Sequence, residues 1–183
     1  TTTAHNVTMP ATVNAGDLLV VVFCNASAAT VTTITTPSGW TKLSEDAGGS
    51  VCNMGIYYRV ADGSEDGTTV NFVTSASRRA TAMTYRIAAG TFDAGTPIEV
   101  GPLNSGASVS PLVPAYSPSW GELDTLVIAA VGSDNLRAVT ARVIGYSDAL
   151  QASGTTSSLS TAASVYGAHA VYRSPNTWPA QFT

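Results

Sequence analysis

Residues 17–24 are Asp17-Leu18-Leu19-Val20-Val21-Val22-Phe23-Cys24, an almost uninterrupted apolar run. The run is rich in β-branched and aromatic side chains, and the turn-forming residues Gly16 and Asn25 flank it, so it predicts a β-strand. A strand with one solvated face would alternate polar and apolar residues, and this one does not. We therefore expect it to lie in the middle of a sheet with both faces covered.

A second stretch of this kind lies in the other half of the chain, where a Gly and an Asp again precede an apolar run, residues 126–131. We expect the two runs to be central strands of one core. The halves, residues 1–88 and 121–183, also match approximately at other positions. This match has two alternative explanations: an internal duplication, or a sequence pattern that β-sandwiches share in general. The Pro- and Gly-rich segment 89–120 is expected to cross between the halves, with short strand pieces around residues 98–100.

Composition favours an all-β fold. Charged residues make up 11% of the 183 residues, well below the usual share of about 25%, and Thr, Ser, Ala and Gly take their place. No segment forms a convincing amphipathic helix, so we predict a single domain, a jelly-roll-like antiparallel β-sandwich. The expected core residues are Leu18, Val20, Val22, Ile56, Tyr58, Val70, Phe72, Leu126 and Ile128.

Two further segments carry specific expectations. Residues 51–60 alternate, which predicts a strand with Met54, Ile56 and Tyr58 toward the core and the face of Asn53 and Tyr57 toward water. Residues 77–87 favour a strand, although their Ala, Arg and Met content would also permit a helix.

Charge and hydropathy exclude two classes of partner. The net charge is −4 with a single lysine, so the sequence lacks the basic face that nucleic acids require. No stretch reaches the 18 to 20 or so apolar residues that span a bilayer, so we expect no membrane partner. Cys24 and Cys52 could form a disulfide between neighbouring strands, but buried free thiols are the favoured alternative.

Few residues point to catalysis. The chain has two histidines, His5 and His169, and no Gly-x-Ser-x-Gly motif, so a nucleophile with a His base is not indicated. Asp62, Glu65 and Asp66 form an acidic turn that could gather around calcium, although its spacing differs from that of an EF-hand. We predict a non-enzymatic protein with no cofactor, no metal and no catalytic residue.

The three tryptophans each follow a proline closely: Trp40, Trp120 and Trp178. Exposed rings placed after turns could stack on sugar faces, so these residues are candidates for glycan binding. The favoured alternative is that each ring plugs an end of the sandwich.

Three motifs resemble those of β-sandwich proteins from the virion surface of tailed bacteriophages: Gly16 to Val21, Pro37 to Thr41 and Tyr57 to Gly63. The resemblance covers roughly the first 90 residues and implies a head decoration protein, a minor tail protein or a fibre module. It brings no catalytic or binding residue to this chain, because the motifs mark strands and turns.

We therefore expect a structural protein on the virion surface, most simply a protein that decorates or cements the capsid or belongs to the tail. The alternative is an extracellular carbohydrate-binding or adhesion module. The weakly charged surface suggests a homo-oligomer or a protein bound to other virion proteins. Segment 101–120 is the candidate contact region, with a lid over the chain's own sandwich as the competing interpretation; its apolar anchors are Leu103, Val109, Leu112, Val113, Tyr116 and Trp120.

Overall fold

The computed structural model of the chain describes residues 2–26, 32–46, 52–106, 108, 110–135, 145–146, 150–153, 162–173 and 180–181. These residues contain strands and no helix. The strands are β1 (Thr2–Thr8), β2 (Leu18–Ala26), β3 (Ile34–Thr35), β4 (Thr41–Asp46), β5 (Cys52–Val60), β6 (Thr69–Arg78), β7 (Ala80–Ile87), β8 (Leu112–Val113), β9 (Asp124–Ser133), β10 (Leu150–Ser153), β11 (Ser164–Arg173) and β12 (Ala180–Gln181). All pairings are antiparallel, which confirms the expected all-β class.

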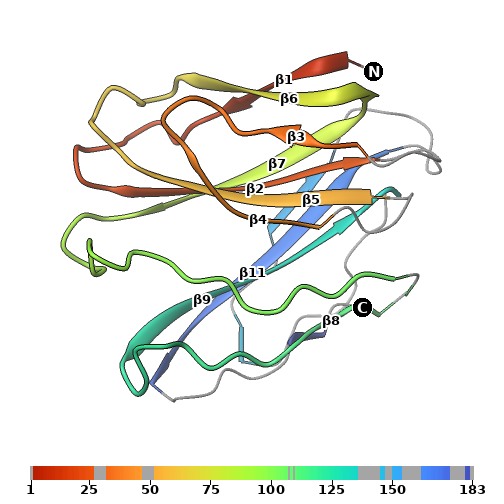
Figure 1. Cartoon of the computed structure of the whole chain (residues 1–183). Helices are drawn as coiled ribbons and strands as arrows, with labels where there is room; N and C mark the ends of the chain where they lie inside the picture. The colour runs from red at the N-terminus through yellow and green to blue at the C-terminus, as the bar shows by residue number, and fades with distance from the viewer. Residues whose placement is uncertain are drawn as a thin grey trace.

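β2 lies inside the largest sheet, whose strand order is β4-β5-β2-β7 (Figure 1). Residues 18–25 pair with β5 on one edge and with β7 on the other. Eight of its nine residues are buried, since a second sheet covers one face and strands of a third lie under the other. The expectation of a central strand covered on both faces is therefore confirmed for this run.

One face of β2 forms the main core of the protein. Leu19, Val21 and Phe23 point toward the sheet of order β1-β6-β3, and the Phe23 ring stacks on Phe72 of β6 at a centroid distance of 5.1 Å. Tyr57 meets the edge of the same Phe72 ring at 5.0 Å. Stacked and edge-to-face rings add to the free energy of apolar burial, so this cluster fixes how the two sheets pack.

The opposite face of β2 points toward the sheet of order β10-β11-β9. Val22 and Cys24 pack there with Met83 of β7 and Val165 of β11. The two sheets touch at this end and separate toward the other, because β9 and β11 run obliquely beneath the larger sheet (Figure 1). The result is a layered, sandwich-like fold; the finer jelly-roll topology stays a prediction.

A buried carboxylate anchors the start of β2. Asp17 is 1% exposed and accepts hydrogen bonds from Arg86 Nε, from the backbone N–H of Asn14 at 2.7 Å and from that of Ala89 at 2.9 Å. These bonds stabilise the charged form and lower the pKa of Asp17 to about 2. The side chain thus ties the turn before β2 to the end of β7.

The expected orientation of β5 is wrong. Asn53, Gly55 and Tyr57 are the buried face, whereas Met54 and Ile56 are half-buried on the other side. The cause is the third sheet, which gives β5 two covered faces, so the larger apolar residues need not mark the core. Asn53 is tolerated in the interior because its Nδ2 donates to the Thr32 carbonyl and, at 2.8 Å, to Glu45.

The expectation for the second apolar run is also wrong in part. β9 is the edge strand of its sheet and β11 is the central one. Leu126 is 43% exposed and Ile128 is half-buried, so neither is a fully buried core residue. Of the other expected core residues, Leu18, Val20, Val22 and Phe72 are buried, while Ile56, Tyr58 and Val70 are half-buried.

Two expectations about the middle of the chain have different outcomes. Segment 77–87 is extended as favoured, but it divides at Arg79 into the end of β6 and the whole of β7, which belong to different sheets. Residues 98–100 form no strand; the strand in segment 89–120 is β8, and it pairs with β12.

Candidate functional site

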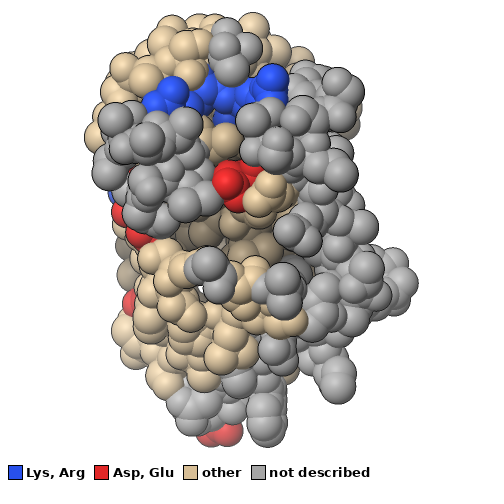
Figure 2. All heavy atoms as spheres, turned by 90° about the vertical axis from the view of Figure 1, so that its right-hand side faces the viewer, with Lys and Arg blue, Asp and Glu red and all other residues tan. Residues whose placement is uncertain are grey.

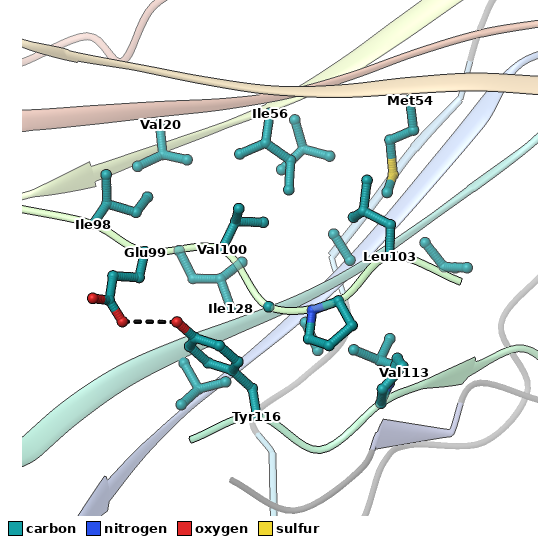
Figure 3. Close-up of a pocket in the computed structure, with 18 of the residues that line it drawn as sticks. Val20, Met54, Ile56, Ile98, Glu99, Val100, Leu103, Val113, Tyr116 and Ile128 are labelled. Atoms are coloured by element: carbon teal, nitrogen blue, oxygen red, sulfur yellow. Dashed lines mark hydrogen bonds between the residues drawn. The ribbon is translucent and has the colours of Figure 1, made fainter. Parts of the chain in front are cut away.

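The structure contains a cavity of about 1140 Å³ between the largest sheet and β9. Figure 3 shows Val20 and Ile56 above it and Ile128 below it, with Ile98 and Val100 crossing between. The cavity is the wedge left where the two sheets diverge. Its walls are mostly apolar, so a ligand in it would be held mainly by burial of apolar surface.

A further wall of the cavity comes from residues 97–106, 108 and 110–118, the described part of a segment that we call the strap. Glu99 connects the beginning of this segment with its end. Its carboxylate accepts hydrogen bonds from Tyr116 Oη at 2.7 Å (Figure 3), from the Ser119 N–H at 2.9 Å and from Ser119 Oγ. These hydrogen bonds lower the pKa of Glu99, with the largest contribution from Ser119, and they keep the carboxylate ionised. The same contact raises the pKa of Tyr116.

The expected contact residues belong to this strap or follow it directly. Leu103 and Leu112 are exposed, whereas Val113, Tyr116 and Trp120 are half-buried. Val109 lies outside the described residues. Because all five described residues line the cavity, the segment covers the chain's own sheets while also presenting apolar side chains to solvent.

The charges around the cavity have one sign. Among the residues that the structure describes, five acidic ones line it and no Lys, Arg or His does; the acids are Asp46, Asp93, Glu99, Asp124 and Asp134. Figure 2 looks onto one end of the wedge and shows a hollow with acidic atoms at its upper edge and basic side chains farther up. The site therefore favours neutral or basic occupants over acidic ones.

The structure describes two of the three tryptophans, and they lie in different environments. Trp40 is 8% exposed and packs against Phe72, with 6.2 Å between ring centroids, so its ring fills the main core. Trp120 is half-buried at the cavity and donates from Nε1 to Thr125 Oγ1 at 2.8 Å. Trp178 lies outside the described residues. No shared sugar-stacking surface is formed by Trp40 and Trp120.

The acidic turn uses its carboxylates within the protein. Glu65 accepts from the Gly63 N–H at 3.0 Å and pairs with Arg59 at 2.9 Å, while Asp62 pairs with the same guanidinium at 2.6 Å. Asp66 accepts from the Val13 N–H. Within the described ranges, no group of three His, Cys, Asp or Glu side chains is placed to hold a metal ion.

The two histidines lie in different sheets. His5 Nε2 is 3.0 Å from Thr74 Oγ1, its ring meets Phe23 edge-on, and burial lowers its pKa. His169 lies on β11 opposite Ile128. The part of the chain that the structure describes also has no helix long and apolar enough to cross a membrane.

The cysteines form a close pair of free thiols at the narrow end of the wedge. Cys24 Sγ and Cys52 Sγ are 3.0 Å apart on the neighbouring strands β2 and β5. The hydrogen bond with Cys52 and complete burial raise the pKa of Cys24 well above its usual value. The favoured alternative of free thiols is confirmed, but only Cys24 is buried as expected, and Cys52 is half-buried.

Comparison with known proteins gives no relative from which a role could be taken: no family model, no curated protein and no solved structure matches the chain.

Proposed function

We propose that this protein is a non-enzymatic structural component of a virus particle, exposed on the capsid or tail and held there by contacts with other virion proteins. The support from sequence is the resemblance of its strand and turn motifs to phage surface β-sandwiches. The all-β, layered architecture is compatible with that class.

The observation that carries the proposal is the placement of exposed apolar side chains. Of seven large apolar residues that are exposed among the described ones, five lie on the strap or around β9 and β11: Leu103, Leu112, Leu123, Leu126 and Val171. Leu126 and Val171 are direct neighbours across the β9–β11 pairing, with 43% and 69% of their surface exposed. Such grouping on one part of the molecule marks a protein contact surface.

The surroundings of this surface favour a structural contact over catalysis. Glu99 is bonded to Tyr116 and Ser119, and His5 lies on β1 in another sheet, whereas His169 lies on β11, the strand that also carries Val171. A carbohydrate-binding role has weaker geometric support, because Trp40 is buried in the main core.

Mass spectrometry of purified particles that carry this gene, followed by imaging of the particle, tests the proposal. The expected result is stoichiometric incorporation of the chain at the capsid surface or the tail. Its absence from particles, together with strong binding on a glycan array, would contradict the virion role and favour the adhesion alternative.

Assembly is tested on the isolated protein. We expect light scattering to show a homo-oligomer, or a monomer that binds purified capsids or tails. Val171→Ser should weaken this association, whereas Val73→Ser, at an exposed position on β6, should not. A clean monomer that binds neither capsids nor tails would end the proposal.

A further inference from the structure

The second half of the chain repeats the strand pairing of the first. The order β10-β11-β9 corresponds to β4-β5-β2, and the β12-β8 pair corresponds to β6-β1. The correspondence also follows chain order, since β8, β9, β10, β11 and β12 succeed one another as β1, β2, β4, β5 and β6 do. We call β1 to β7 the first unit and β8 to β12 the second unit.

Two glycines support this correspondence independently of the sheets. Gly39 has a φ of 78° and precedes Trp40 and β4. Gly145 has a φ of 86° and precedes Tyr146, ahead of β10. A left-handed backbone favours glycine, so the same turn chemistry occurs at matching places in both units.

One long strand of the first unit lacks a counterpart. β7 pairs with β2 from Leu18 to Asn25, along the edge opposite to β5. β9 has β11 on one edge, and no strand of the described chain pairs with its other edge. Among the described residues, no strand therefore takes beside β9 the place that β7 takes beside β2.

The open place coincides with the cavity. Residues from the whole length of β9 line the cavity, and its opposite wall carries Val20, Val22 and Ile56. Unpaired N–H and C=O groups along a strand edge are a template for a further strand. An extended segment entering here would gain backbone hydrogen bonds from β9 and apolar contacts from the largest sheet.

The charges of the cavity indicate the chemistry of that segment. The described part of its lining carries five acidic residues and no basic one. β7, which fills the corresponding place in the first unit, is Ala-Thr-Ala-Met-Thr-Tyr-Arg-Ile, with one basic and no acidic residue. An occupant of this composition is complementary to the site, and an acidic one is not.

We infer that the open edge of β9 is an acceptor site for one β-strand of a partner polypeptide, a strand with alternating apolar residues, at least one basic residue and no acidic residue. This mode of recognition is β-strand addition, in which backbone hydrogen bonds give affinity and side-chain pockets give specificity. The site stands on the strand order and the cavity, and it does not depend on the virion role.

The test uses the full chain and a fluorescein-labelled peptide with the sequence of residues 80–87. Fluorescence anisotropy should show saturable binding with one peptide per chain. A peptide N-methylated at alternate residues keeps its side chains but loses backbone donors, and we expect it to bind at least tenfold more weakly. Replacement of its Arg by Glu should also weaken binding, because the lining is acidic.

A protein variant locates the site. Ile128→Trp places a larger ring in the cavity wall and should reduce peptide affinity at least tenfold, whereas Val73→Trp, exposed on β6, should not change it. Far-ultraviolet circular dichroism and urea unfolding verify that both variants are folded. Hydrogen exchange should show that the peptide protects amides of β9.

Three results would overturn the inference: no binding of the peptide, equal binding of its N-methylated form, or protection of β2 amides in place of β9. A dimer of the chain alone that Ile128→Trp dissociates would assign the site to a second copy instead of a partner polypeptide.

Discussion

The first and second units share a strand order, yet they differ in how their equivalent strands are covered. β2 is paired on both edges and packed on both faces. β9 is paired on one edge and faces a cavity over much of its length. Similar apolar runs therefore have different environments, since burial depends on which neighbours the rest of the chain supplies.

The comparison also separates two physical roles. The first unit holds the stacked rings of the main core and the buried ion pair of Asp17, the features that stabilise a fold. The second unit holds the exposed Leu126 and Val171 and the acid-lined wedge, the features that suit contact with another molecule. Stability and recognition are thus assigned to different parts of one chain.

The largest expected effect comes from the main core. Phe72→Ala should lower the free energy of unfolding by about 3–5 kcal/mol, since Phe72 is fully buried and contacts Phe23, Tyr57 and Trp40. Ile128→Ala, on β9 of the second unit, should cost less than about 2 kcal/mol because the side chain borders a cavity. Urea unfolding measures both. Equal losses would remove the energetic distinction between the units.

The next effect concerns the thiols. Diamide should oxidise Cys24 and Cys52 to a disulfide and take up the two hydrogens that the thiols lose. Both free thiols should then disappear, and the mass of the protein should fall by two hydrogens. The bond would close a loop between residues 28 positions apart and raise the free energy of unfolding by about 3 kcal/mol. Oxidation should be faster at higher pH, because thiolate is the reactive form and the pKa of Cys24 is raised.

Cys52→Ser provides the control for the thiol experiment and should keep one thiol after the same treatment. A cross-link between two chains, detected on a non-reducing gel, would show that the pair seen at 3.0 Å is not the reacting pair.

A smaller effect is expected from the anchor of β2. Asp17→Asn should lower the Tm at pH 7 by about 5 °C, because Arg86 and two backbone N–H groups lose the charged acceptor that the buried Asp17 provides. The folded pKa of about 2 lies below the ordinary Asp value, so the contribution is present above pH 4 and disappears as the pH falls toward 2.

Thermal unfolding between pH 7 and pH 2 checks this prediction: the difference in Tm between wild type and Asp17→Asn should shrink across the acid range. Asp124→Asn, at the exposed start of β9, should change the Tm by less than about 2 °C. A constant difference at all pH values would show that the lost contact is not ionic.

The pattern of residues 17–24 was sufficient to predict the centre of the main core, because seven consecutive apolar residues after Asp17 favour a strand covered on both faces. The same reasoning failed for β9, where local sequence cannot show that the second neighbour is missing. It also failed for β5, since alternation tells two faces apart but not which one lies against which sheet.

The candidate site was predictable only in outline. Its apolar anchors in segment 101–120 were visible, but the strap contains β8, a strand of two residues among prolines, which no periodicity reveals. The cavity depends on the angle between two sheets, and the acidic lining is assembled from positions as distant as Asp46 and Asp134. Such features arise from tertiary packing and have no local signal.

Amide hydrogen exchange of β2 and β9, measured on the same sample without any ligand, tests most directly the claim that β9 lacks the neighbour that β7 provides for β2. Protection of β2 amides should be uniform, since both of its edges are hydrogen-bonded. Along β9 it should alternate, with slow amides facing β11 and fast amides facing the open edge. Uniform protection along β9, equal to that of β2, would contradict the account.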